Sequence, residues 1–178
     1  VGGVLLRWYH VDAASLWWDE LLQIRIAEQD GFWQVFRKTK EGLSPDAANA
    51  GAVPRDYLLL HAYLAVAPTP TAEFRELYYR VPSFVFSSTA IVLLFAYCRR
   101  FFGRSVAMLA CLLLALSIPH VLYAAEARFY SWFVLMTIVN LWAFTRVVLD
   151  RSSGRAWAVF TVVNVLYFLS GLMGLLSM

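Results

Sequence analysis

Four long stretches without a single Asp, Glu, Lys or Arg constrain this chain more than any other feature. They span residues 81–98, 105–125, 129–145 and 156–178. An ionised side chain in the hydrocarbon core of a bilayer costs about 2.5–3.5 kcal/mol on insertion scales, so long gaps between charges mark membrane spans. At about 1.5 Å per residue, each stretch reaches most or all of a core roughly 30 Å thick. The sequence therefore predicts an all-α fold, a polytopic transmembrane helical bundle.

The composition excludes the other broad classes of protein. Hydrophobic residues make up 61% of the chain and charged residues 15%, against about 45–50% and about 25% in soluble globular proteins. Such a chain is neither disordered nor a nucleic-acid module with a basic face, so we expect no nucleic acid among its partners. Cys98 and Cys111 lie in apolar runs and indicate no disulfide framework.

Arginines between the spans predict how the chain is oriented. Two short connections carry them: Arg99, Arg100 and Arg104 in one, and Arg146, Arg151 and Arg155 in the other. Two spans separate these connections, so both lie on one side of the membrane, which the positive-inside rule assigns to the cytoplasm. Arginine outnumbers lysine so strongly that the composition suggests a GC-rich bacterial genome, and hence a bacterial inner or plasma membrane.

This orientation places residues 10–80 in one outer-face loop. The apolar run 57–67 is short, contains His61 and is bounded by prolines, so we expect a helix lying along the membrane. Ser15 is predicted to cap a helix over 16–28, and Asp30-Gly31 to end it. Phe32 to Lys40 suits the headgroup level and 41–55 a plain loop, while Thr69 and Pro70 should start the helix that leads into the first span.

We therefore expect one module over residues 1–178, with juxtamembrane helices in 10–80 and four transmembrane helices in 81–178. The opening run 1–6 is expected to be the end of a further helix. Because 156–178 stops without a polar cap, we also expect the chain to be the N-terminal part of a longer polypeptide.

The charged residues of the outer face are the candidates for chemistry. Asp19 and Glu20 follow two tryptophans and form a carboxylate pair near the membrane, suited to a general base or a hard-metal ligand. The alternative is an interfacial aromatic belt followed by solvated acids.

A second group lies between the second and third spans. Glu126 and Tyr130 are four residues apart and would share a helical face if the helix started early. Arg128 offers the bidentate fork that suits phosphate, and Arg80, before the first span, would add a second guanidinium. The alternatives are a local Glu–Arg ion pair and an arginine that anchors a helix end. His61 shares its short helix with Tyr57, four residues away, facing the same compartment.

Five segments, in order and spacing, resemble the N-terminal part of membrane glycosyltransferases of the C-superfamily. The resemblance is to the protein O-mannosyltransferase and aminoarabinose-transferase branch, which includes glycosyltransferase family 39. The segments are Ser15 to Glu20, Pro54 to His61, Glu76 to Ser83, Arg99 to Arg104 and Ala124 to Ser131. The chain departs from the family pattern at Pro54, which is followed by Arg55 and Asp56 where a proline pair is usual.

The resemblance implies an enzyme that takes a sugar from a polyprenyl-phosphate donor at the extracytoplasmic face and passes it to a protein, lipid or glycan. It implies that Asp19, with its neighbour Glu20, is the catalytic base or engages the acceptor or a metal. It places Glu126 as a second carboxylate that can bind Mg²⁺ or Mn²⁺ together with Asp19, and Arg80 and Arg128 near the donor phosphate. Tyr57, His61 and Tyr130 are the expected substrate-binding residues.

Two other functions stay open from the sequence. One is a transporter, although transporters usually place their polar residues near the membrane midplane, and here the charges gather at one face. The other is a non-catalytic relative that binds lipid or assists assembly. The later helices of such enzymes are absent from this chain, so we expect the fragment alone to be inactive.

Overall fold

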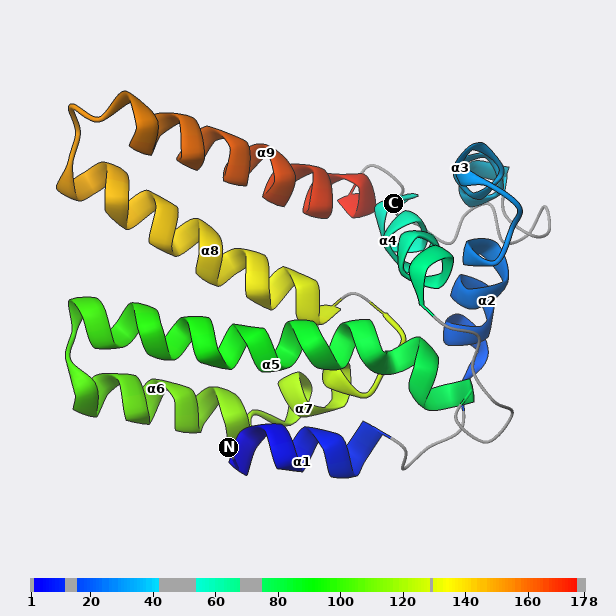
Figure 1. Cartoon of the computed structure of the whole chain (residues 1–178), viewed down its shortest axis with the longest axis horizontal. Helices are drawn as coiled ribbons and strands as arrows, with labels where there is room; N and C mark the ends of the chain where they lie inside the picture. Colours follow the sequence, from blue (N-terminus) through cyan, green and yellow to red (C-terminus); the bar gives the residue numbers. More distant parts are fainter. Residues whose placement is uncertain (1, 12–15, 42–53, 68–74, 129, 176–178) are drawn as a thin grey trace.

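The computed structural model describes residues 2–11, 16–41, 54–67, 75–128 and 130–175, and these form helices and turns without a strand (Figure 1). This confirms the predicted all-α membrane bundle. The helices are α1 (Gly2–Val11), α2 (Trp18–Ala27), α3 (Phe32–Glu41), α4 (Pro54–Val66), α5 (Arg75–Phe101), α6 (Arg104–Leu116), α7 (Ile118–Ala124), α8 (Tyr130–Leu149) and α9 (Gly154–Leu175).

Within the described ranges, two helices are long and apolar enough to cross a membrane without a break. They are α5, over Glu76–Phe101, and α8, over Tyr130–Leu149. Helix α9 has 22 residues. Its segment Gly154–Phe168 is apolar but shorter than the length required of a membrane-crossing helix. Helix α4 has 13 residues and covers about 20 Å, which is less than the hydrocarbon core and fits the prediction that it does not cross.

The stretch 105–125, expected to be one span, is broken into α6 and α7. The two helices meet at a 63° bend, and Ser117 between them has an extended backbone (ψ 113°). Pro119 lies in the first turn of α7, where its missing N–H costs nothing, whereas inside a continuous helix its ring would clash with the preceding turn. The charge-free window therefore measured apolar length correctly and missed the bend.

Different elements lie at the two ends of the bundle (Figure 1). The α5–α6 and α8–α9 connections, which carry the arginine clusters, lie at one end, as their separation by two spans predicts. Helices α2, α3 and α4 lie at the opposite end. The candidate residues near the starts of α2, α5 and α8 are thereby brought to the same end as these short helices.

Helix α5 is central and packs against both α6 and α8, and α8 packs against α9. Ala90 on α5 is fully buried against Leu135 and Ile138 of α8, and such small residues let membrane helices approach closely. Between α8 and α9, the Asn140 side-chain amide donates a hydrogen bond of 3.0 Å to that of Asn164. This pair of polar residues therefore joins α8 to α9.

The short helices form a small unit of their own. Ile26 of α2, Val35 of α3 and Tyr57 of α4 bury one another. Helix α3, the segment predicted for the headgroup level, buries Val35 and exposes Phe32 and Trp33, which is the amphipathic pattern of an interfacial helix.

The predicted boundaries of the short helices need correction. Helix α2 begins at Trp18 with Trp17 as its N-cap, so it starts two residues later than predicted, and Ser15 lies outside the described residues. It ends at Ala27, and Gly31 follows with a φ of +99°, a value that glycine adopts without strain. Thr69, Pro70 and most of the predicted loop 41–55 also lie outside the described residues.

Candidate functional site

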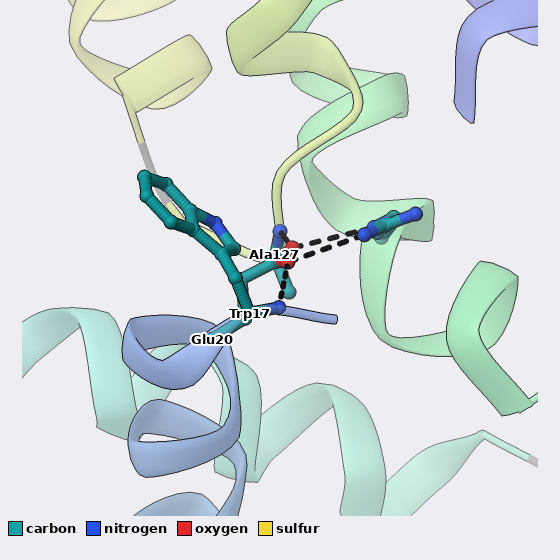
Figure 2. A network of polar contacts seen from close by, with 4 residues as sticks. Trp17, Glu20 and Ala127 are labelled. Atoms are coloured by element: carbon teal, nitrogen blue, oxygen red, sulfur yellow. Dashed lines mark hydrogen bonds and ion pairs between the residues drawn. The ribbon is translucent and has the colours of Figure 1, made fainter. Parts of the chain in front are cut away.

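The carboxylate of Glu20 lies at the centre of a buried polar network (Figure 2). Its side chain has no exposed surface, and that of Arg80 is 3% exposed. Arg80 Nε donates to Glu20 Oε1 at 3.3 Å and Nη2 donates to Oε2 at 3.2 Å. The backbone N–H of Ala127 donates to Oε1 at 2.6 Å, and that of Trp17 donates to Oε2 at 3.2 Å. Glu20 therefore ties α2 to α5 and to the turn before α8.

The local sequence explains why Glu20 occupies this position. Glu20 is the third residue of α2, and its carboxylate reaches back to the N–H of the N-cap residue Trp17, which is half of a capping box. A carboxylate in the first turn also faces the positive end of the helix dipole. Burial of its charge is tolerated because Arg80 and two backbone donors replace the lost water.

Two serine hydroxyls hold the turn between α7 and α8 against the bundle. Ser83 on α5 donates to the carbonyl of Arg128 at 2.8 Å. Ser131 on α8 donates to the carbonyl of Tyr123 on α7 at 3.0 Å. The backbone of Arg128 is thus fixed, while its side chain extends toward the start of α2.

Asp19, the neighbour of Glu20, has a different environment. Its side chain is 51% exposed, and its Oδ2 accepts a charge-assisted hydrogen bond of 3.1 Å from Arg128 Nη1, whose side chain is 33% exposed. The Arg128 guanidinium also lies 4.8 Å from the centre of the Tyr130 ring, within the range of a cation–π contact. Asp19, Arg128 and Tyr130 therefore form an accessible group of opposite charges beside an aromatic ring.

Glu126 is the least satisfied carboxylate of this region. Its Oε2 is buried, with no hydrogen-bond partner among the described residues. Burial raises the pKa of Glu126, and the charges of Glu20 and Asp19 add to the effect, while Arg128 and Arg80 oppose it. Glu126 thus lies among four charged side chains and has one oxygen free to accept a proton or a cation.

Metal-binding capacity can be judged from the available oxygens. Within the described ranges no group of three or more His, Cys, Asp or Glu side chains could hold a metal ion. Mg²⁺ sites commonly use one or two protein carboxylates, with waters and substrate phosphate completing the shell. The free Oε2 of Glu126 and the exposed carboxylate of Asp19 are compatible with that kind of site, in which the substrate supplies part of the shell.

Tyr57 and His61 lie outside this group. Tyr57 is buried between α2 and α3, and His61 Nδ1 is 2.9 Å from the carbonyl oxygen of Ala27 at the end of α2. His61 lines a separate hollow of about 360 Å³, together with Tyr78 and Tyr79. In this structure both residues help to place the short helices and are not next to Asp19.

Six of the eight predicted site residues therefore come together at one end of the bundle: Asp19, Glu20, Arg80, Glu126, Arg128 and Tyr130. The expected reason for pairing Glu126 with Tyr130 was wrong, because α8 begins only at Tyr130; they are near each other through the turn. The prediction did not include the backbone donors of Trp17 and Ala127. No side-chain pattern signals them, since every residue type except proline supplies a backbone N–H.

Comparison with known protein families gives a match. The model of the dolichyl-phosphate-mannose-protein mannosyltransferase family matches residues 56–176, which is more than half of the chain. The matched region contains Arg80, Glu126, Arg128 and Tyr130, and it begins after Asp19 and Glu20. Searches among curated proteins and among solved structures found no match.

Proposed function

Because the chain belongs to the dolichyl-phosphate-mannose-protein mannosyltransferase family and is a membrane glycosyltransferase, we propose that it uses a polyprenyl-phosphate sugar as donor. The proposed acceptor is a hydroxyl group of a protein, lipid or glycan, and the reaction takes place on the extracytoplasmic side of the membrane. The observation that supports this proposal most strongly is the accessible Asp19–Arg128 pair beside Tyr130.

In the proposed reaction, the acceptor oxygen attacks the anomeric carbon of the sugar. A bond forms between these atoms, the bond from the anomeric carbon to the phosphate oxygen breaks, and the lipid phosphate leaves with that electron pair. A hydroxyl group is a weak nucleophile, so a carboxylate within hydrogen-bond reach must accept its proton. We assign this role to Asp19, whose side chain is half exposed and can meet a substrate.

Arg128 is the proposed partner of the donor phosphate. A guanidinium binds phosphate with two parallel hydrogen bonds and stabilises the charge that the leaving group keeps. In the structure, Arg128 binds Asp19. A phosphate that takes the place of Asp19 on Arg128 would free the carboxylate to act as base, so that donor binding prepares the catalytic group.

Glu20 and Arg80 are proposed as positioning residues. Their side chains are buried and engage each other, which leaves them unsuited to contact a substrate directly. They fix α2 to the bundle, and Asp19 is the residue before Glu20. The buried pair therefore sets where the proposed base lies.

A divalent cation, Mg²⁺ or Mn²⁺, is a further proposal, with Glu126 and Asp19 as its protein ligands. The unpartnered oxygen of Glu126 supports it, and such a cation would neutralise charge on the donor phosphate. If the proposal holds, Mn²⁺ should protect the turn before α8 from proteolysis or hydrogen exchange. This protection should be weaker in the Asp19→Asn protein than in wild type. Equal protection in both proteins would remove Asp19 from the ligand set.

The proposed sidedness rests on the arginine-rich connections. They lie at the opposite end of the bundle from Asp19 (Figure 1), and short loops rich in arginine stay in the cytoplasm. The site would then face away from the cytoplasm. Cysteines introduced at positions 30 and 152 test this: an impermeant reagent added from outside should label the first and spare the second, and the reverse pattern would refute the orientation.

The experiment for the activity is sugar transfer in membranes that contain the full-length protein. Radiolabelled polyprenyl-phosphate mannose is the first donor to supply, with a panel of other polyprenyl-phosphate sugars beside it. Asp19→Asn should abolish transfer, whereas Asp30→Asn, a matched change at an exposed carboxylate just after α2, should leave it unchanged. Transfer by Asp19→Asn at the wild-type rate would show that Asp19 is not the base.

A further inference from the structure

A groove of about 720 Å³ opens at the end of the bundle opposite to Asp19. It lies between α5, α8 and α9, and each of these helices contributes one arginine to it: Arg100, Arg146 and Arg155. The proposed sugar transfer uses none of these residues. The groove is therefore a second candidate site, distant from the first.

The mouth of the groove is positively charged. Arg100, Arg146 and Arg155 are exposed, and no ion pair involves them among the residues that the structure describes. Asp150 is the acidic residue that lines the groove, and its carboxylate accepts a hydrogen bond from Ser152 at 3.0 Å. Three arginines from three helices thus line one groove with one carboxylate, and this excess of positive charge favours an anionic ligand.

The wall of the groove below the arginines is apolar. Leu93 precedes Arg100 by two helical turns on α5, and Val139 precedes Arg146 by the same interval on α8. Val163 lies just over two turns after Arg155 on α9. Two turns correspond to about 10 Å along a helix, so the apolar wall continues about that far into the membrane from the charged mouth.

A charged mouth above an apolar wall suits an amphipathic ligand better than a soluble anion. A free phosphate would use only the arginines, whereas a phospholipid would use both parts: its phosphate at the guanidinium groups and the upper part of an acyl chain against the aliphatic wall. Basic pockets between transmembrane helices bind anionic lipid headgroups in this way. Trp142, which also lines the groove, is a residue type that favours the membrane–water interface.

We propose that this groove is a binding site for one anionic phospholipid, such as phosphatidylglycerol. The proposal needs only that the chain is embedded in a membrane, and it does not depend on the sugar donor or on Asp19. Loss of transfer activity in an Asp19 variant therefore leaves it unaffected. Its failure would likewise leave the proposed glycosyl transfer standing.

Arginines near membrane spans also act simply as topological signals, and the chain offers a matched control for that. Arg99, Arg104 and Arg151 lie in the same two connections, are exposed and do not line the groove. The test compares two triple variants of the full-length protein: Arg100→Gln/Arg146→Gln/Arg155→Gln and Arg99→Gln/Arg104→Gln/Arg151→Gln. Both remove three positive charges from the same end.

The measurement is native mass spectrometry of protein purified from nanodiscs with equal amounts of phosphatidylglycerol and phosphatidylcholine. Wild type and the control triple variant should retain one phosphatidylglycerol in preference to phosphatidylcholine. The groove triple variant should lose this preference by about a hundredfold, because each of its three basic side chains contributes about fivefold at an anionic surface. Equal loss in both triple variants would show a general charge effect and overturn the proposal.

A further variant separates the lipid from a free anion and covers the case in which the groove triple variant does not fold. Val159 lines the groove and is half exposed, so Val159→Trp leaves every charge in place and obstructs the apolar wall. It should lower retention of phosphatidylglycerol by several-fold. Unchanged retention in Val159→Trp, or displacement of the lipid by millimolar inorganic phosphate, would show that only a headgroup-sized anion site exists and would refute binding of the whole lipid.

Discussion

Replacement of Glu20 by Gln tests the part of the site on which the rest depends. Gln keeps the shape of Glu and one acceptor oxygen, but it removes the negative charge that faces Arg80. The Arg80 side chain is 3% exposed, so water cannot replace that charge. Breaking a buried ion pair from one side costs about 3–5 kcal/mol, and the backbone N–H groups of Ala127 and Trp17 both lose a charged acceptor.

The cost should appear first as local opening of α2, because Glu20 joins this helix to α5 and to the turn before α8. Hydrogen–deuterium exchange of Trp18–Ala27 in detergent or nanodiscs measures it. At about 1.4 kcal/mol per factor of ten, protection of these amides should fall by about two to three and a half orders of magnitude, or to the level of unfolded chain if α2 detaches. The transmembrane parts of α5 and α8 should keep their protection.

The adjacent carboxylate is the matched control. Asp19→Asn breaks an ion pair whose partners are 51% and 33% exposed, and such pairs contribute about 0–1 kcal/mol. Protection of α2 should then fall by about fivefold at most. If Asp19→Asn and Glu20→Gln lowered protection equally, the division between a buried positioning residue and an accessible catalytic residue would be wrong.

Three further predictions follow from particular contacts. Burial raises the pKa of Glu126, so the folded state binds this proton more tightly than the unfolded state does. The folded state therefore loses stability as pH rises from the ordinary glutamate pKa through the raised one. In thermal unfolding at several pH values, Glu126→Gln should be more stable than wild type above that pH window and equally stable below it. Ser83→Ala removes a hydrogen bond of 2.8 Å to the carbonyl of Arg128, and at about 1 kcal/mol it should speed hydrogen exchange in the turn before α8 by about fivefold; unchanged exchange would show that the bond does not hold the turn. The Asn140–Asn164 bond should give a coupling energy of about 0.6 kcal/mol in a double-mutant cycle with leucine, and additive effects would show that it contributes nothing.

The sequence was sufficient to predict the bundle because charge dominates where helices can enter a membrane. The charge-free windows correspond to α5, α8, α9 and the broken pair α6 and α7. The break itself was not predicted, although Pro119 marks it, because window counting treats proline as one more uncharged residue. A proline well inside a window, as Pro119 is in 105–125, is the signal that would have divided it. Pro82, at the start of the window 81–98, lies inside α5 without dividing that helix.

The candidate site was predicted less completely, for a physical reason. The sequence shows charged side chains at the ends of spans, and six of the predicted residues do meet. It does not show which of two adjacent carboxylates points inward. That choice depends on the capping geometry at Trp17 and on the backbone N–H of Ala127, both of which are set by the fold and are the same for almost any residue type.

The connection between the short helices and the bundle explains why this choice matters for function. The contacts that join them, among the described residues, include an apolar cluster with Ile24, Leu60 and Tyr79, a hydrogen bond from the Tyr79 hydroxyl to Glu28, the Asp19–Arg128 pair and the Glu20 network. The apolar cluster is non-directional and would tolerate small rotations of α2. The network is directional, since Glu20 must face Arg80 and Ala127 at once. With Glu20 so oriented, the preceding residue can only point elsewhere, and Asp19 is therefore held at the accessible side, where Arg128 meets it.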